Sequence, residues 1–242
     1  MTDDDPAATD SSPRRSDDPS ADPPGPIAPV TRPETAARDW YDTLSGWYDV
    51  VADPFEAQPR AAGLEVLDAS PGERVLDVGC GTGRALVELA RAVGPSGTAV
   101  GIDIAEGMCR VSRRALADAG LETGTVIAGD ATTLPFSDDV FDALFASFVL
   151  ELFDTPAIMR VLKEWHRVLD PAGRLCVVSL SRRGDGPLTW VYETVHELAP
   201  TYVDCRPIYL RETLLEAGFR DLETRTGTVW RFPVEIVRCR PA

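Results

Sequence analysis

The stretch VLDVGCGTG, residues 75–83, carries the clearest signal for the fold of this chain. Its first residues form the short apolar run of a buried strand, and glycines follow at positions 79, 81 and 83. Glycine is required where the backbone takes a positive φ, or where a ligand lies too close for a Cβ atom. A helical pattern begins at residue 84, so the stretch predicts a strand, a glycine turn and a helix, with a ligand site at the turn.

Short apolar runs and helical patterns alternate along the chain, which predicts a parallel sheet covered by helices on both faces. The predicted strands are 74–78, 98–102, 125–128, 141–147 and 174–180, followed by 219–229 and 232–240, which join tightly near Trp230. The predicted helices are 84–93, 106–119, 155–168, 187–198 and 208–217. A turn is expected at Pro171-Ala172-Gly173, and Gly218 is expected to end the last helix. The sequence thus predicts one doubly wound α/β domain over residues 35–242.

The first 34 residues differ from the rest, because they are rich in Asp, Pro, Ser and Ala and show no apolar periodicity. Such a composition cannot bury enough apolar surface to order itself, so we expect a disordered acidic tail over residues 1–34. The start of the chain lacks the basic and apolar parts of a secretory signal, and no apolar run is long enough to span a bilayer. We therefore expect a cytoplasmic protein with no stable membrane insertion.

The chain carries a formal net charge of −15, with 39 acidic residues against 24 basic ones. Such a surface repels phosphate backbones, so we expect no nucleic-acid partner. The excess of carboxylates fits either adaptation to high salt or a GC-rich genome, and both explanations stay open. The five cysteines include no C-x-x-C pair and the two histidines are His166 and His196, so we expect reduced thiols and no bound metal.

Acidic residues beside the glycine turn indicate its ligand. Asp77 lies two residues before Gly79, where a carboxylate suits an ammonium group and would repel a pyrophosphate. The spacing G-x-G-x-G, with Arg84 next, differs from the dinucleotide spacing G-x-G-x-x-G. Asp103 ends the second strand, where its carboxylate can accept two hydrogen bonds from a ribose diol. The alternative for this residue is a helix N-cap, in a capping box with Glu106.

A third carboxylate follows the third strand in Gly129-Asp130-Ala131. There Asp130 can accept a hydrogen bond from an adenine amino group, while a backbone N–H reads the neighbouring ring nitrogen. The alternative is an aspartate that only forms a turn. Together with Asp77 and Asp103, this residue indicates a site for an adenosyl amino acid.

At this point the sequence resembles the class I S-adenosylmethionine-dependent methyltransferases over roughly residues 40–240. The resemblance is carried by residues 75–83, Gly101-Ile102-Asp103, Gly129 to Ala131 with Leu134-Pro135-Phe136, and Phe141-Asp142. Within that family the chain is most similar to the ubiquinone and menaquinone biosynthesis methyltransferases, through the Leu-Pro-Phe segment and Arg167-Val168-Leu169. The resemblance implies a Rossmann-like, seven-stranded, mostly parallel sheet with an antiparallel last strand.

The resemblance also implies S-adenosyl-L-methionine as the cofactor. The implied cofactor-binding residues are Asp77, Gly79, Cys80, Gly81, Gly83, Asp103, Ile104, Asp130, Ala131 and Ser147. The acceptor side should lie at the ends of the fourth and fifth strands, so Glu151 and His196 are candidate catalytic residues. The candidates for contact with the substrate are Tyr41, Tyr48 and Tyr192.

These residues predict methyl transfer to a small-molecule acceptor, such as a quinone precursor or another hydrophobic metabolite. At residues 148–153 the chain reads FVLELF, where the quinone branch usually has an Arg-Asn pair. Two other functions stay open: an NAD-dependent oxidoreductase with a Rossmann domain, which the glycine spacing disfavours, and a cofactor-binding homologue without activity. Phospholipid N-methylation is a variant of the first function. The acceptor, the methylated atom and the choice between monomer and homodimer stay open.

Overall fold

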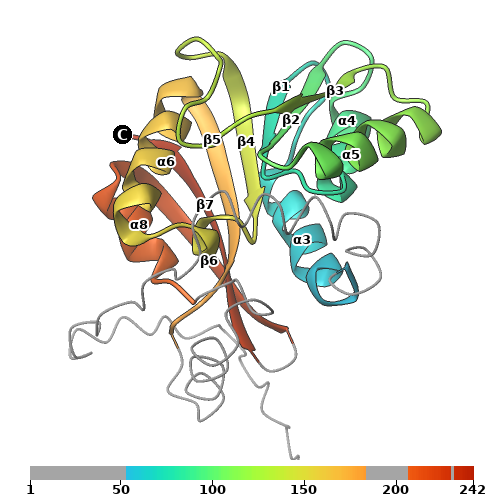
Figure 1. The fold of residues 1–242 in the computed structure, drawn as a ribbon. Helices are drawn as coiled ribbons and strands as arrows, with labels where there is room; N and C mark the ends of the chain where they lie inside the picture. Colours follow the sequence, from blue (N-terminus) through green and yellow to red (C-terminus); the bar gives the residue numbers. More distant parts are fainter. Residues whose placement is uncertain (1–52, 184–206, 230–231) are drawn as a thin grey trace, which may run out of the picture.

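The computed structural model describes residues 53–183, 207–229 and 232–242, which form a seven-stranded sheet with helices on both faces (Figure 1). The strands are β1 (Arg74–Val78), β2 (Thr98–Asp103), β3 (Gly124–Ala128), β4 (Phe141–Ser147), β5 (Leu169–Leu180), β6 (Phe219–Val229) and β7 (Phe232–Pro241). The helices are α3 (Asp53–Leu67), α4 (Arg84–Val93), α5 (Glu106–Asp118), α6 (Thr155–Val168) and α8 (Leu210–Glu216), with a short 3-10 helix, η1 (Leu150–Leu152).

The strand order is β3-β2-β1-β4-β5-β7-β6. Strands β1 to β5 pair in parallel, and β7 runs antiparallel to both of its neighbours, β5 and β6. The predicted fold class is therefore confirmed. The order reverses between β1 and β4, since the chain runs outward from β1 to β3 and then returns to β4. In doubly wound sheets, ligands bind at the carboxyl ends of the strands beside such a switch point.

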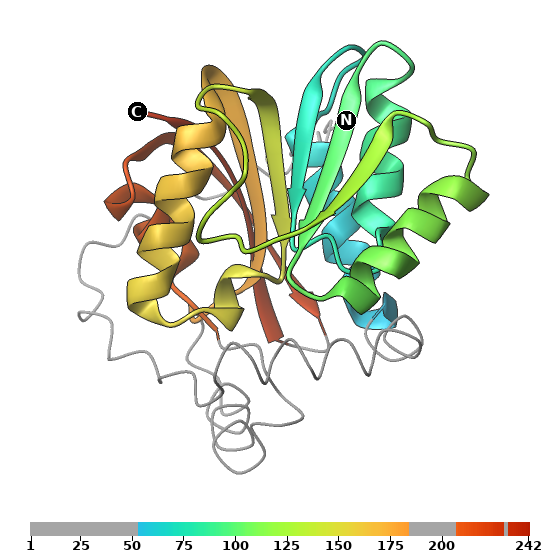
Figure 2. The same cartoon turned by 45° about the horizontal axis from the view of Figure 1, so that its top comes forward.

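Alternate residues of the central strands pack into two separate cores, one on each face of the sheet. In β5, Leu175 and Val177 pack with α6 and α8, whereas Cys176 and Val178 pack with α3, α4 and α5. Figures 1 and 2 show the helices in these two layers. Both faces of the central strands are thus covered, which explains why these strands are continuous apolar runs in the sequence.

The connection from β3 to β4, residues 129–140, contains no helix. Parallel strands need a crossover connection, which is usually helical. Here an irregular segment crosses the sheet on the face that α6 covers (Figure 2). Leu134 is buried in the core on that face, and Phe136 and Val140 pack against it. We call residues 129–140 the crossover loop.

Helix α3 has no counterpart among the predicted elements. It contains Pro59, which lacks a backbone N–H and normally ends a helix, and its apolar residues show little helical periodicity. Tertiary packing holds it in place, since a Cβ atom on Gly63 would lie 2.4 Å from Cγ2 of Val178. None of the helices in the described ranges has the length and apolar character needed to cross a membrane.

Arg174 of β5 ties the end of α3 to the sheet. Its guanidinium donates hydrogen bonds to the backbone oxygens of Leu67 (2.6 Å) and Asp68, and to both carboxylate oxygens of Glu73 (2.8 Å each). These bonds satisfy carbonyl groups that the end of a helix leaves without partners. The cluster lies at the amino edge of the sheet, opposite the carboxyl ends of the parallel strands.

Strand β5 begins earlier than predicted, so the expected turn at Pro171-Ala172-Gly173 lies inside it. Leu169 pairs with Phe141 and Arg174 with Ala143, which places four residues opposite the single residue 142. The irregularity is a bulge that keeps a local turn, because Oδ1 of Asp170 accepts the N–H of Ala172 at 2.8 Å.

The other predicted strands and helices of the described ranges are confirmed to within about two residues. The predicted helix 208–217 is observed as α8, and Gly218 follows it with a φ of +87° and donates its N–H to the oxygen of Leu215 at 3.1 Å. The expected tail over residues 1–34, the expected helix 187–198 and Trp230 lie outside the described residues.

Candidate functional site

The glycine turn joins β1 to α4 at the carboxyl edge of the sheet. Gly79 has a φ of +66°, and a Cβ atom there would lie 2.4 Å from Cγ2 of Val149, in the chain that leaves β4. Gly81 has a φ of +52°, and no atom of the described residues lies within 4 Å of the place where its Cβ would be. Within that part of the chain, the backbone at Gly81 borders open space, as a loop that approaches a ligand must.

Two other residues of the turn contribute to its packing. The side chain of Cys80 is buried in the core beneath α4 and α5, and its N–H donates to the oxygen of Ile102 at 3.1 Å. Gly83 is the N-cap of α4 and packs against Ser112 of α5. Both residues hold the turn against the helical layer, and Cys80 could meet a ligand through its backbone.

Asp103 lies at the end of β2, beside the glycine turn. Its Oδ2 accepts the N–H of Gly81 and its Oδ1 accepts the N–H of Ala105, both at 2.9 Å. The N-cap of α5 is Ala105, and Glu106 pairs with Arg113 at 2.8 Å, so the capping box weighed for Asp103 does not form. The carboxylate is instead fixed in orientation and remains partly exposed.

Asp77, in β1, is only 2% exposed. Its Oδ2 is buried and has no hydrogen-bond partner among the described residues. Burial, followed by the negative charge of Asp103, raises the pKa of Asp77 to about 8. A cation placed against this oxygen would relieve both effects, so the residue suits a ligand that brings an ammonium group.

The end of β4 lies beside the glycine turn, on the other side of the switch point. The Oγ atom of Ser147 is buried and also lacks a partner in the described structure. Phe148, which follows, has a φ of +57°, a strained value for a bulky residue, and donates its N–H to the oxygen of Val178 at 2.8 Å. The strain turns the chain so that Val149 packs against Gly79.

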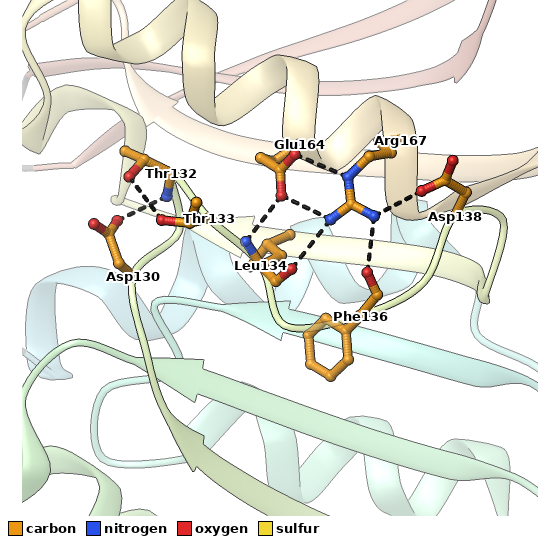
Figure 3. Close-up of polar contacts among 8 residues, drawn as sticks. All are labelled: Asp130, Thr132, Thr133, Leu134, Phe136, Asp138, Glu164 and Arg167. Atoms are coloured by element: carbon orange, nitrogen blue, oxygen red, sulfur yellow. Dashed lines mark hydrogen bonds and ion pairs between the residues drawn. The ribbon is translucent and has the colours of Figure 1, made fainter.

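The third edge of the site is the start of the crossover loop. The N–H of Gly129 donates to the oxygen of Asp103 at 2.9 Å, which joins the ends of β2 and β3. Oδ1 of Asp130 accepts the N–H of Thr132 at 2.7 Å, so the turn weighed for this residue does form (Figure 3). Asp130 and Ala131 are both half-buried, and Ile104 exposes 37% of its surface next to Asp103.

These observations bring the ten predicted cofactor-binding residues together at the carboxyl ends of β1 to β4. Among the residues that the structure describes, the site combines an open stretch of glycine backbone, a fixed carboxylate and buried oxygens without partners. Such a set fits an adenosyl amino acid, since Asp77 can receive its ammonium group and Asp103 its ribose hydroxyls. That assignment of individual residues stays a prediction.

Of the residues predicted for catalysis and substrate contact, only Glu151 lies in the part of the chain that the structure describes. Glu151, in η1, is fully buried, with Oε2 accepting from Oγ of Ser179 (3.1 Å) and Oε1 accepting from the N–H of Leu180 (3.2 Å). Burial raises the pKa of Glu151 to about 7, against the hydrogen bonds, which lower it. Its catalytic role stays a prediction, and the remaining candidates, Tyr41, Tyr48, Tyr192 and His196, lie outside the described residues.

Sequence reasoning missed the residues that hold the crossover loop. Arg167 of α6 contacts the backbone of Leu134 and Phe136, and Glu164 accepts the N–H of Leu134 (Figure 3). The available signal was weak: a Glu and an Arg three residues apart share one helix face, as many exposed ion pairs do.

The sequence is similar to several proteins that are named as methyltransferases. Residues 75–173 match the family model described as a methyltransferase domain. The chain is 35% identical over 153 residues to a demethylmenaquinone methyltransferase of Bacillus cytotoxicus, covering 62% of this chain and 64% of the relative. It is 38% identical over 169 residues to nocamycin O-methyltransferase of Saccharothrix syringae, covering 67% of this chain and 59% of the relative. The matched regions span less than two thirds of either relative.

Solved structures share the fold at lower identity. Magnesium protoporphyrin IX methyltransferase from Synechocystis PCC 6803, with bound SAH, has a TM-score of 0.67 at 19% identity, covering 87% of this chain and 100% of that chain. The [4+2]-cyclase SpnF has a TM-score of 0.69 at 22% identity, covering 89% of this chain and 97% of that chain. At these identities the likeness shows the fold alone.

The fold, the glycine turn and the matched domain define a Rossmann-like methyltransferase domain. Over residues 75–173 the chain is similar to the class I S-adenosylmethionine-dependent methyltransferases, the family that its motifs indicate.

Proposed function

We propose that this protein transfers a methyl group from S-adenosylmethionine to a small-molecule acceptor. The observation that carries the proposal is the pair of carboxylates beside the glycine turn. Asp77 keeps a buried oxygen that has no partner in the described part of the chain, and Asp103 is held by two backbone N–H groups next to the backbone of Gly81. The matched methyltransferase domain supports the same reaction.

Each carboxylate has a separate task in this proposal. When bound, S-adenosylmethionine supplies a methyl group on a positively charged sulfur that is already activated for transfer. Asp77 pairs with the ammonium group, Asp103 accepts from the ribose hydroxyls, and Asp130 accepts from the adenine amino group. With the cofactor held in this way, the chain has mainly to align the acceptor, and such alignment can lower a barrier by up to about 7–11 kcal/mol.

The acceptor we propose is a quinone precursor or another hydrophobic metabolite. One relative is named for demethylmenaquinone, and the other is named as an O-methyltransferase for nocamycin. Both names refer to small molecules, which supports this class of acceptor without choosing between carbon and oxygen. An acceptor screen with mass detection of a 14 Da increase, about one CH₂ group, tests this part of the proposal, and no product from any small molecule would contradict it.

The decisive test of the cofactor site is the variant Asp103→Ala. We expect its affinity for S-adenosylhomocysteine, measured by calorimetry, to fall about 100-fold or more, because two charge-assisted hydrogen bonds are lost. The matched control is Asp142→Ala, since Asp142 also accepts a backbone N–H, from Arg74 at 2.7 Å, but at the opposite edge of the sheet. Wild-type affinity in Asp103→Ala would contradict the proposal, and circular dichroism checks that both variants fold.

Two other functions are separated by simple measurements. A nicotinamide dinucleotide would place its pyrophosphate near the buried carboxyl of Asp77, and the like charges would repel each other. A thermal-shift comparison of NAD with S-adenosylmethionine tests the oxidoreductase function. Stabilisation by NAD alone would favour the oxidoreductase. Binding of S-adenosylmethionine without turnover of any acceptor would favour a homologue without activity.

A further inference from the structure

The crossover loop has no helix, and two side chains of α6 form hydrogen bonds with the middle of its backbone. Oε2 of Glu164 accepts the N–H of Leu134 at 2.9 Å. The guanidinium of Arg167 donates to the backbone oxygens of Leu134 (3.1 Å) and Phe136 (2.8 Å), and to Oδ1 of Asp138 (2.8 Å). Figure 3 shows Arg167 between Glu164 and Asp138, facing the loop backbone.

Glu164 and Arg167 also hold each other in place. Nε and Nη2 of Arg167 donate to Oε1 and Oε2 of Glu164 at 2.8 and 2.7 Å, so all three nitrogens of the guanidinium are engaged. The side chains are 29% and 20% exposed, for Arg167 and Glu164 respectively, which screens them partly from solvent. Hydrogen bonding between them lowers the pKa of Glu164 and raises that of Arg167, so both stay charged at neutral pH.

The anchored part of the loop lies four residues from Asp130. Between these points the backbone is already constrained, because Oδ1 of Asp130 accepts from Thr132 and its backbone oxygen accepts from the N–H of Thr133 at 3.1 Å. At its other end the loop is bonded to the oxygen of Asp103 through Gly129. A hydrogen-bonded path therefore runs from the cofactor side of β2, through Asp130, to α6.

We propose that Glu164 and Arg167 are positioning residues for the adenine end of the cofactor. They hold the crossover loop so that the carboxylate of Asp130 and the backbone N–H of Ala131 face the base. Neither side chain touches the ligand, and the inference rests on the proposed function. The planar fork of arginine is required, because lysine cannot serve two backbone oxygens and a carboxylate in one plane.

The test compares two ligands in the full chain, by calorimetry. S-adenosylhomocysteine carries the adenine amino group, and S-inosylhomocysteine carries an oxygen in its place. The oxygen is accompanied by a hydrogen on N1 of the base, so the analogue loses both the bond to Asp130 and the bond from the N–H of Ala131, and we expect wild type to prefer S-adenosylhomocysteine by about tenfold or more. In Arg167→Lys we expect the affinity for S-adenosylhomocysteine to fall about tenfold and that for S-inosylhomocysteine to change less than about twofold, so that the preference disappears.

The control for general loss of stability is Arg174→Lys. Arg174 makes a comparable fork to two backbone oxygens and Glu73, but at the end of α3, away from the crossover loop and the glycine turn. We expect this variant to keep the wild-type preference. Glu164→Gln is a milder second variant, because it keeps the size of the side chain. We expect it to reduce the preference for S-adenosylhomocysteine as well, so it can replace Arg167→Lys if that variant does not fold.

Amide hydrogen exchange gives a direct readout without ligand. We expect the amides of residues 130–134 to exchange faster in Arg167→Lys than in wild type, while the amides of β1 and β4 exchange at the same rate in both. Equal weakening of both ligands, an unchanged preference, or the same loss in Arg174→Lys would overturn the inference while leaving the proposed function intact. Failure of wild type to bind S-adenosylhomocysteine would instead overturn the proposed function.

Discussion

At the scale of single residues, Asp77 combines two properties that rarely occur together. Its side chain is 2% exposed, and one of its oxygens has no partner among the described residues. Burial and the charge of Asp103 raise the pKa of Asp77 to about 8, so in the cofactor-free protein the carboxyl holds a proton at neutral pH. The residue therefore becomes charged when a cation arrives.

The titration of Asp77 has a consequence for stability. The folded state binds the proton more tightly than the unfolded state, so the free energy of unfolding falls as the pH rises from about 4 to about 8, by at most about 1.4 kcal/mol per unit. We expect Asp77→Asn to flatten this dependence in urea unfolding without cofactor at pH 5, 7 and 8.5. The control is Asp142→Asn, at the other edge of the sheet, and equal slopes in wild type and Asp77→Asn would refute the prediction.

The carboxyl of Asp77 also couples binding of the cofactor product to the release of a proton. An ammonium partner lowers the pKa of Asp77, so binding of S-adenosylhomocysteine at pH 7 should release close to one proton. Calorimetry in two buffers of different ionisation enthalpy measures this number. The release should be absent in Asp77→Asn, which should also bind about tenfold or more weakly.

At the scale of secondary-structure elements, Glu151 joins η1 to the end of β5. Its oxygens accept from Ser179 and Leu180, and burial raises the pKa of Glu151 to about 7. The raised pKa means that the carboxyl costs little below about pH 4, where it is neutral in both states, and destabilises the folded protein increasingly up to about pH 7, above which it is charged in both. The desolvation cost of this carboxyl thus grows as the pH rises, although its hydrogen bonds from Ser179 and Leu180 favour the charged form.

The variant Glu151→Gln removes the charge and keeps the shape. We expect its free energy of unfolding to exceed that of wild type by about 1–2 kcal/mol more at pH 8 than at pH 5. Urea unfolding at both values measures the difference, and an equal offset at the two would count against it. If Glu151 also serves as a base, kcat falls in this variant while the affinity for S-adenosylhomocysteine stays the same.

The elements differ in how well the sequence predicts them. Strands β1 to β4 and helices α4 to α6 follow from local apolar patterns and from the glycine turn, because these signals lie within each segment. Helix α3 contains Pro59 and depends on contacts of Gly63 with Val178, more than 100 residues away, which no local pattern shows. The bulge in β5 likewise depends on its pairing with β4.

The site shows the same division. Asp77, Gly81 and Asp103 were predictable, because each stands at a fixed distance from a strand end in the sequence. The capping alternative for Asp103 could be rejected only once Ala105 was seen as the N-cap of α5. The contacts of Arg167 with Leu134 and Phe136 join segments about 30 residues apart, so their role required the folded structure.

At the scale of the whole molecule, the net charge of −15 makes the folded state repel itself. Salt screens such repulsion over about 10 Å at 0.1 M, so we expect the melting temperature to rise by about 2–4 °C between about 0.01 and 0.5 M NaCl. Thermal melts at constant pH measure this, with sucrose at matched osmolality as the control. A melting temperature that stays constant or falls with added salt would contradict the prediction. Activity measured in multimolar salt separates the two explanations of the acidic composition, adaptation to high salt and a GC-rich genome.

The fork of Arg174 has a consequence for how the chain is made. It joins β5 to the backbone oxygen of Leu67, 107 residues earlier. During synthesis, the hydrogen bond between Arg174 and the end of α3 cannot form until the ribosome has released the residues that lie between them. The last turn of α3 therefore gains this contact only after β5 has been made. Contacts of such long range slow folding.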